Sequence, residues 1–256
     1  MRTRHAAHPL RRQTMTDTEA PLRHDLATAL RWAARLGLHE GVCNHFSVVV
    51  PKADGANTRR FLINPEGLHW DEMTPEAIVS CALDDEGEDV PDGVEATAYF
   101  IHREIHRLVP HATCALHTHM PYATALTLRR NMRLRMASQN ALRFYGRIAY
   151  DDHYGGLALG AEEGERIAGA LGKADIAFLA NHGVVAVAET VAEAFDDLYY
   201  LERVCQTQIL AETGGAELRD LDEATCTAVA AQFASERTAG ANRHFEALKR
   251  MAATGF

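Results

Sequence analysis

The stretch Cys114-Ala115-Leu116-His117-Thr118-His119 decides the fold around it, because a short apolar run ends in two histidines at alternate positions. In a β-strand, alternate side chains point to the same face, and the Cα atoms of His117 and His119 would lie about 6.6 Å apart. Two imidazoles at that separation can bind one metal ion. The chain has 14 histidines in 256 residues, so one such pair is expected by chance and the spacing alone is weak evidence.

A third histidine strengthens the pattern. His182 follows the apolar run at 176–180 and lies in the corner Asn181-His182-Gly183, where the glycine would give the backbone the freedom to aim His182 inward. Three histidines at strand ends leave coordination positions open, which is typical of a catalytic metal site. From the residues alone, three unrelated histidines, two of them hydrogen-bonded to the backbone, are an equal alternative.

The remaining pattern predicts an α/β fold, one domain with a mixed sheet covered by helices. Apolar periodicity and end signals predict helices at 21–36, 93–108, 121–128, 161–171 and 190–212, strands at 46–50, 61–63, 78–83, 114–119, 176–180 and 184–188, a helical turn at 74–76, and polar turns at 52–55 and 84–87. Residues 1–20 are predicted to be a disordered extension, a transit-like tail being the alternative, residues 21–215 the main domain, and residues 216–256 a helical tail.

The composition excludes several classes of protein. The formal net charge of −9 gives no electrostatic footprint for nucleic acid or an anionic membrane. No apolar run approaches the roughly 20 residues that span a bilayer. Five cysteines without a close pair exclude a zinc ribbon and suit a reducing compartment. We therefore expect a soluble, cytoplasmic protein.

Four motifs, in this order, resemble the class II aldolase/adducin family, and most of all its bacterial class 2 aldolases of unassigned substrate. They are Gly41-Val42-Cys43-Asn44-His45-Phe46-Ser47, Ile63-Asn64-Pro65-Glu66-Gly67, His117-Thr118-His119 and Asn181-His182-Gly183. The resemblance extends over about residues 22–212. It implies a three-layer αβα domain around a central, mostly antiparallel mixed sheet. It also implies a homo-oligomer, commonly a cyclic tetramer with active sites between subunits.

The resemblance makes His117, His119 and His182 the ligands of a zinc ion, with Fe²⁺ or Mn²⁺ as alternatives, that polarises a substrate carbonyl. One departure concerns the catalytic glutamate of the sugar-phosphate aldolases, whose position here is Ala98. Glu95, one helical turn earlier, is the candidate replacement. A structural role for Glu95 as an acid at a helix N-terminus is an equal alternative.

A second departure concerns the substrate. The family's phosphate-binding pattern implies Asn44, Asn64, Glu66 and Gly67 as substrate-binding residues, but Glu66 stands where the aldolases have threonine. A carboxylate 4 Å from a phosphate charge costs about 4 kcal/mol at an effective dielectric constant of 20. We therefore predict an unphosphorylated hydroxy or keto substrate. Glu66 could instead bind a hydroxyl or amine together with His69, or cap a turn.

The sequence thus predicts a zinc-dependent lyase that cleaves a C–C bond or decarboxylates through a metal-stabilised enolate of a small molecule. The alternatives are a non-heme Fe(II) oxygenase at the same three histidines, and a non-catalytic interaction protein such as adducin. Three secondary expectations concern other residues. His102 and His106 are expected on a helix surface, Tyr199, Tyr200 and Glu202 are expected to pack or pair along their helix, and residues 138–145 are expected to line an interface pocket.

Overall fold

The computed structural model describes residues 18–51, 59–84, 87 and 89–253. Within them, seven strands form one sheet with the order β3-β2-β1-β4-β7-β6-β5. Their bounds are β1 His45–Val50, β2 Arg60–Ile63, β3 Val79–Ala82, β4 Cys114–Thr118, β5 Ile148–Asp151, β6 Ile176–Leu179 and β7 Gly183–Ala188. Neighbouring strands are antiparallel except β5 and β6, which are parallel. The predicted mixed, mostly antiparallel sheet is confirmed.

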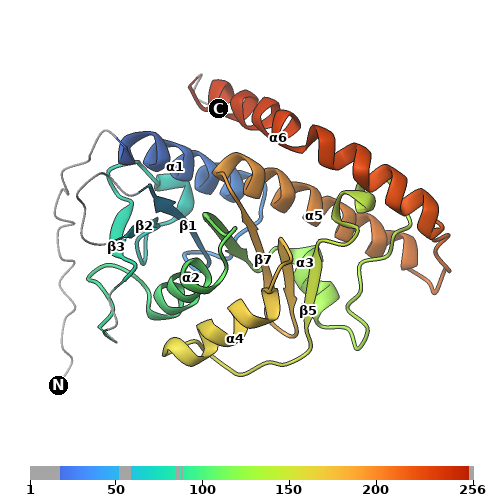
Figure 1. The fold of residues 1–256 in the computed structure, drawn as a ribbon, viewed down its shortest axis with the longest axis horizontal. Helices are drawn as coiled ribbons and strands as arrows, with labels where there is room; N and C mark the ends of the chain where they lie inside the picture. Colours follow the sequence, from blue (N-terminus) through green and yellow to red (C-terminus); the bar gives the residue numbers. More distant parts are fainter. Residues whose placement is uncertain (1–17, 52–58, 85–86, 88, 254–256) are drawn as a thin grey trace.

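Helices cover both faces of the sheet, so the chain has three layers. Figure 1 shows α2 and α4 on one side and α1, α5 and α6 on the other. The bounds are α1 Glu19–Arg35, α2 Ala96–Leu108, α3 Pro121–Thr127, α4 Ala161–Leu171, α5 Val191–Glu212 and α6 Glu223–Ala253, with short 3-10 helices η1 Trp70–Glu72 and η2 Gln139–Phe144. None of the helices described has a segment long and apolar enough to cross a bilayer.

Strand alternation decides which residues enter each layer. Phe46 and Leu116 pack in the core beneath α1 and α5, whereas Ala115 and Val185 pack in the core beneath α2 and α4. In the register of β1 with β4, His45 lies opposite His117 and Phe46 lies opposite Leu116. The histidines of both strands therefore belong to the α2 side of the sheet.

The structure contains elements that the sequence pattern did not predict. β5 and η2 were not predicted, because the polar and apolar side chains of residues 139–151 follow neither the period of a helix nor that of a strand. The predicted turn at Thr74-Pro75-Glu76 is present, with Ala77 N donating to Thr74 O at 3.1 Å. The N-terminal residues 1–17, the turn at 52–55 and part of the turn at 84–87 lie outside the described residues.

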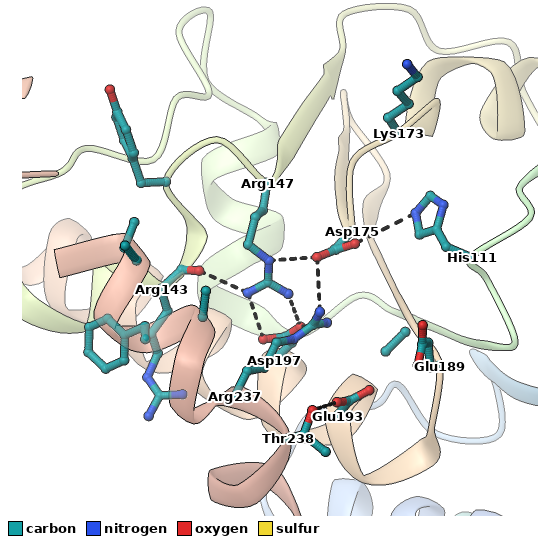
Figure 2. A pocket seen from close by; sticks show the side chains of 16 residues that line it. His111, Arg143, Arg147, Lys173, Asp175, Glu189, Glu193, Asp197, Arg237 and Thr238 are labelled. Atoms are coloured by element: carbon teal, nitrogen blue, oxygen red, sulfur yellow. Dashed lines mark hydrogen bonds and ion pairs between the residues drawn. The ribbon is translucent and has the colours of Figure 1, made fainter. Parts of the chain in front are cut away.

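Four charged side chains fasten α6 to the rest of the domain. Arg147 and Arg237 alternate with Asp175 and Asp197 in a closed ring of ion pairs, which Figure 2 shows. Asp197 of α5 accepts from Arg147 at 2.5 Å and from Arg237 of α6 at 2.8 Å, and only 3% of its side chain is exposed. The ring joins α6 and α5 to Arg147 and Asp175, the residues just before β5 and β6.

Candidate metal centre

Three histidines converge where β4 and β7 meet. β4 ends just before His119 and β7 begins just after His182, and the two strands are antiparallel neighbours. The ring centroids of His117, His119 and His182 lie 4.7 to 5.0 Å apart. One ring nitrogen of each lies within 4.8 Å of the other two, and within the described residues this is the one group of three or more such side chains that could hold a metal ion.

Hydrogen bonds orient two of the three rings. His117 Nδ1 donates to Val184 O at 3.0 Å, and His119 Nδ1 lies 2.8 Å from a carboxylate oxygen of Glu40. Since a carbonyl and a carboxylate can only accept, both protons are assigned to Nδ1. The two Nε2 atoms, 3.2 Å apart, then offer their lone pairs to the same point. A carboxylate behind a histidine is a common outer partner of metal ligands.

Burial keeps the imidazoles of His117 and His182 neutral, as metal ligands must be. Burial lowers the pKa of His117 well below its usual value, with His182 and His45 adding to the effect. Burial also lowers the pKa of His182 to about 4, with a further contribution from His119. His117 is enclosed, whereas 24% of the His119 side chain is exposed. A small molecule can therefore approach from the side of His119 and His182.

The corner that carries His182 is a three-residue loop between β6 and β7. Asn181 adopts the left-handed conformation, with φ of 58°, which asparagine tolerates better than most residues. The prediction that Gly183 supplies the backbone freedom was wrong, because its φ is not positive. Gly183 is needed for space: a Cβ there would lie 2.5 Å from Thr118 O and 2.7 Å from His119 Cδ2.

Asn44 ties the turn before β1 to the histidine cluster. Its φ is 75°, and its Oδ1 accepts from Glu40 N at 3.1 Å and from His119 N at 3.3 Å. Asn64 supports it, since Asn64 Oδ1 accepts from Phe46 N at 2.8 Å and its Nδ2 donates to Asn44 O. Asn44 and Asn64, two of the four predicted substrate-binding residues, therefore hold the backbone beside the site. Asn44 Nδ2 is enclosed without a partner among the described residues.

The other predicted site residues lie on connecting segments. Glu66 and Gly67 are exposed, and Gly67 has a φ of 75°. Glu95 is the N-cap of α2, where its carboxylate accepts from Ala98 N at 2.9 Å and from the Thr97 hydroxyl. This contact matches the alternative, structural role of Glu95. Catalysis by Glu95 and substrate binding by Glu66 and Gly67 stay predictions.

Two secondary expectations have different outcomes. The expectation that His102 and His106 lie on a helix surface was wrong, because they are 0% and 5% exposed. They lie on the face of α2 that packs on the sheet. Glu202 is buried as expected, and its carboxylate accepts from Tyr122 N and Ala123 N at the start of α3.

Three features of the site were not predicted. The first is the hydrogen bond between Glu40 and His119, which are far apart in the sequence. The second is a buried chain of hydrogen-bonded side chains that runs from His45 through His102 and Ser47 to His106. Tyr154, between β5 and α4, has its ring centroid 6.2 Å from that of His182. The sequence contained a signal for this buried chain of hydrogen bonds. His45 and Ser47 lie two residues apart on a strand, and His102 and His106 lie four apart on a helix, so each pair shares one face.

A separate cavity of about 670 Å³ lies at the other end of β4 and β7. Its walls include Arg143, Arg147, Asp197 and Arg237, and Figure 2 shows the ion pairs that join three of them. Arg143 pairs with Asp196 of α5. Because these charges neutralise one another, the cavity offers no excess charge of either sign. The predicted role of residues 138–145 at an interface stays a prediction.

Acid should destabilise the metal-free protein between pH 6.5 and pH 4. Burial lowers the pKa of His106 to about 4, so the unfolded chain binds this proton before the folded chain does. The stability is fully present above pH 6.5 and is lost as the pH falls toward 4, at a maximum cost of about 3 kcal/mol for His106 alone. Urea unfolding at pH 7.5 and pH 5.0 measures it. The variant His106→Gln should show a flatter pH dependence, and an equally stable wild type at both pH values would contradict the prediction.

Comparison with known proteins places this chain in one family. A family profile described as "Class II Aldolase and Adducin N-terminal domain" matches residues 24–209. The chain belongs to this family, as its motifs predicted. A protein of Pseudomonas aeruginosa, provisionally named an aldolase class 2 protein, is 33% identical over 77% of this chain and 73% of its own length.

Other relatives carry different names. An enzyme of Streptomyces roseochromogenus named 4-hydroxy-3-prenylphenylpyruvate oxygenase/4-hydroxy-3-prenylbenzoate synthase is 31% identical over 82% of this chain and 75% of its own length. Alpha-adducin of Rattus norvegicus is 33% identical over 78% of this chain, but this covers only 27% of the adducin.

Solved structures share the fold. The crystal structure of an aldolase II superfamily protein from Pseudomonas syringae has a TM-score of 0.82 and 33% identity, covering 93% of this chain and 94% of the other. L-fuculose 1-phosphate aldolase from Glaciozyma antarctica has a TM-score of 0.77 at 24% identity, covering 94% and 95%. The second likeness shows the fold alone.

Proposed function

We propose that the protein is a metal-dependent carbon–carbon lyase in which His117, His119 and His182 hold a zinc ion. The observation that carries the proposal is the convergence of three ring nitrogens within 4.8 Å. The donor set fits zinc, which prefers neutral imidazole and keeps an open position when only three protein ligands bind. Fe²⁺ and Mn²⁺ are the alternatives at the same site.

Bound zinc would supply Lewis-acid stabilisation of negative charge on a substrate oxygen. The chain's own residues position the site: Val184 O and Glu40 fix the rings of His117 and His119, and Asn44 holds the turn that carries Glu40. Helix α2 presents the methyl group of Ala98 at the predicted position of the family's catalytic acid. Decarboxylation of a β-keto acid needs no base before the C–C bond breaks, so this site favours decarboxylation over aldol cleavage.

The substrate is a small, unphosphorylated hydroxy or keto compound. The exposed carboxylate of Glu66 would repel a phosphate bound beside Gly67. The protein acts as a cytoplasmic homo-oligomer, a tetramer by its resemblance to the family. The exposed apolar side chains of Leu157 and Leu159, close in sequence to Tyr154, suit a subunit contact.

Elemental analysis of the purified protein, combined with a screen of β-keto acids and hydroxy-aldehydes, tests this function. We expect about one zinc per chain and metal-dependent release of carbon dioxide or an aldehyde. A chain that binds none of Zn²⁺, Fe²⁺ and Mn²⁺ after loading would overturn the proposal.

Two alternatives make different predictions. The 31% identical Streptomyces relative named an oxygenase supports an Fe(II) oxygenase, for which the iron-loaded protein would consume oxygen on turnover. The adducin relatives support an interaction protein, whose function would survive the double change His117→Ala and His119→Ala. The three converging histidines favour an enzyme, because an interaction protein has no need of them.

Glu40→Gln should weaken zinc binding by about 10- to 100-fold, as other changes to the outer partners of metal ligands do. The amide removes the charge that accepts from His119 Nδ1 at 2.8 Å but keeps the size of the side chain. Competition with a chelator of known zinc affinity measures the change. Glu66→Gln removes an exposed charge from another segment and serves as the control, and equal affinities for Glu40→Gln and wild type would contradict the prediction.

Tyr154→Phe should lower turnover by about 100-fold or more if the phenol delivers the proton that completes the reaction. The ring of Tyr154 lies 6.2 Å from that of His182, whereas the Glu95 carboxylate is engaged by the start of α2. Rate measurements on Tyr154→Phe and Glu95→Gln, each with its zinc content, separate the two candidates. A larger loss in Glu95→Gln would assign the proton transfer to Glu95.

A further inference from the structure

A chain of buried hydrogen bonds leads from the core to the edge of the histidine cluster. His106 Nδ1 lies 2.7 Å from Ala112 O, and its Nε2 lies 2.7 Å from the hydroxyl of Ser47. The same hydroxyl contacts His102 Nδ1, and His102 Nε2 lies 2.7 Å from His45 Nδ1. All four side chains are at most 6% exposed. The chain joins β1 to the inner face of α2.

The carbonyl of Ala112, at one end, fixes which atom donates in every hydrogen bond of the chain. Ala112 O can only accept, so His106 carries its proton on Nδ1 and its Nε2 accepts from Ser47. The single hydroxyl proton of Ser47 is then used, so Ser47 must accept from His102 Nδ1. His102 Nε2 in turn accepts from His45 Nδ1. Each group donates toward Ala112.

The opposite direction would require a charged imidazole in the core. If Ser47 donated to His102, then His106 would need protons on both ring nitrogens. Burial lowers the pKa of His106 to about 4 and that of His102 well below its usual value, so neither ring carries a charge near neutral pH. The hydrogen-bond geometry therefore admits one arrangement of neutral rings.

The consequence falls on His45 Nε2, which is left as an acceptor without a partner among the described residues. Its ring stacks on His117, with centroids 4.8 Å apart and planes inclined by 29°. His45 Nε2 is not among the fully enclosed polar atoms that lack a partner, and 6% of His45 is exposed. His45 is also outside the group of three converging ligands, so its lone pair is not counted among the proposed ligand atoms.

We propose that His45 is a further substrate-binding residue, held by this chain as a hydrogen-bond acceptor for a hydroxyl group of the substrate. The assignment rests on the proposed function, since it places the substrate at the three histidines. A hydroxyl donates to the lone pair, whereas a phosphate or carboxylate oxygen in the same place brings a second acceptor against it. His45 thereby selects an uncharged polyhydroxy or hydroxy-keto end of the substrate over an anionic one.

The tautomer of His45 can be measured on the metal-free wild-type protein, whatever its activity. Nitrogen-15 NMR of labelled histidines distinguishes protonated from unprotonated ring nitrogens. We expect a proton on Nδ1 and none on Nε2 of His45 at pH 7.5. A proton on Nε2 would overturn the proposal, and this result would leave the zinc site untouched.

Ligand selection is tested on the zinc-loaded protein with two matched probes, dihydroxyacetone and dihydroxyacetone phosphate. The wild type should bind the uncharged probe at least tenfold more tightly. Ser47→Ala cuts the chain and frees His45 to carry its proton on Nε2, so the preference should fall about tenfold. Ser47→Thr keeps the hydroxyl and should keep both the tautomer and the preference.

Each outcome of the binding experiment bears on one claim. A wild type that prefers the phosphorylated probe, or an unchanged preference in folded Ser47→Ala, would overturn the role of His45. If Ser47→Ala does not fold, the wild-type tautomer still decides, whereas the wild-type preference alone does not, because Glu66 also favours the uncharged probe. Failure of the wild type to bind zinc would instead overturn the proposed function, while the NMR result on His45 would stand.

Discussion

His119→Ala should reduce the affinity for zinc by at least about 100-fold and abolish turnover. Structural zinc sites with four ligands bind with about 10 to 16 kcal/mol, so one ligand accounts for about 3 kcal/mol, or about two orders of magnitude. The change also leaves the Glu40 carboxylate without the ring that it orients. The loss should exceed that in Glu40→Gln, because a ligand is removed and not only its outer partner.

The measurement is zinc stoichiometry after dialysis against a chelator, followed by turnover with the best substrate from the screen. His24→Ala is the matched control, since His24 is an exposed histidine on α1. It should keep the zinc content and activity of the wild type. A zinc content in His119→Ala equal to that of the control would mean that His117 and His182 do not share a site with His119.

Asp197→Ala should destabilise the fold by about 3 to 5 kcal/mol, the usual cost of removing one partner from a buried ion pair. The carboxylate is 3% exposed and accepts from two arginines, so its loss leaves Arg147 and Arg237 with only Asp175 between them. Because Arg237 belongs to α6, the helix should also open more often. Zinc binding should be unchanged, since the cluster lies at the other end of β4 and β7.

Urea unfolding measures the loss of stability, and hydrogen exchange along α6 measures the opening. Asp152→Ala is the control, because Asp152 is 74% exposed and its nearest arginine nitrogen is 3.8 Å away. It should change stability by less than about 1 kcal/mol. If Asp197→Ala were as stable as the control, the ring of ion pairs would make no net contribution to the free energy of unfolding.

Most of the fold was predictable because its signals are local. The apolar period of α1, α4 and α5 and the compact apolar runs of β4, β6 and β7 can each be recognised within a window of 4 to 22 residues. β5 was missed because it is a short edge strand of mixed polarity, Ile148-Ala149-Tyr150-Asp151, which forms by pairing in parallel with β6. Its stability is a tertiary effect that no local window contains.

The histidines of the candidate site were predictable for the same reason, and its supporting residues were not. His117 and His119 lie two residues apart, and His182 lies in the turn Asn181-His182-Gly183 right after an apolar strand. Glu40, by contrast, meets His119 across 79 residues. His45 meets His102 across 57 residues, in a contact set by the packing of α2 on β1. The motif that contains Asn44 indicated that this segment lies near the site. The register of β1 with β4, however, decides that His45 lies opposite His117.

Gly183 has a consequence for how this protein can change. Every other amino acid would place a β-carbon 2.5 Å from Thr118 O and against the ring of His119. Any substitution at Gly183, natural or engineered, would therefore disturb the neighbouring strand end. Efforts to redirect the proposed activity toward new compounds should therefore hold Gly183 constant. Diversity belongs in residues 152–157, where most side chains are exposed and Tyr154 lies near His182.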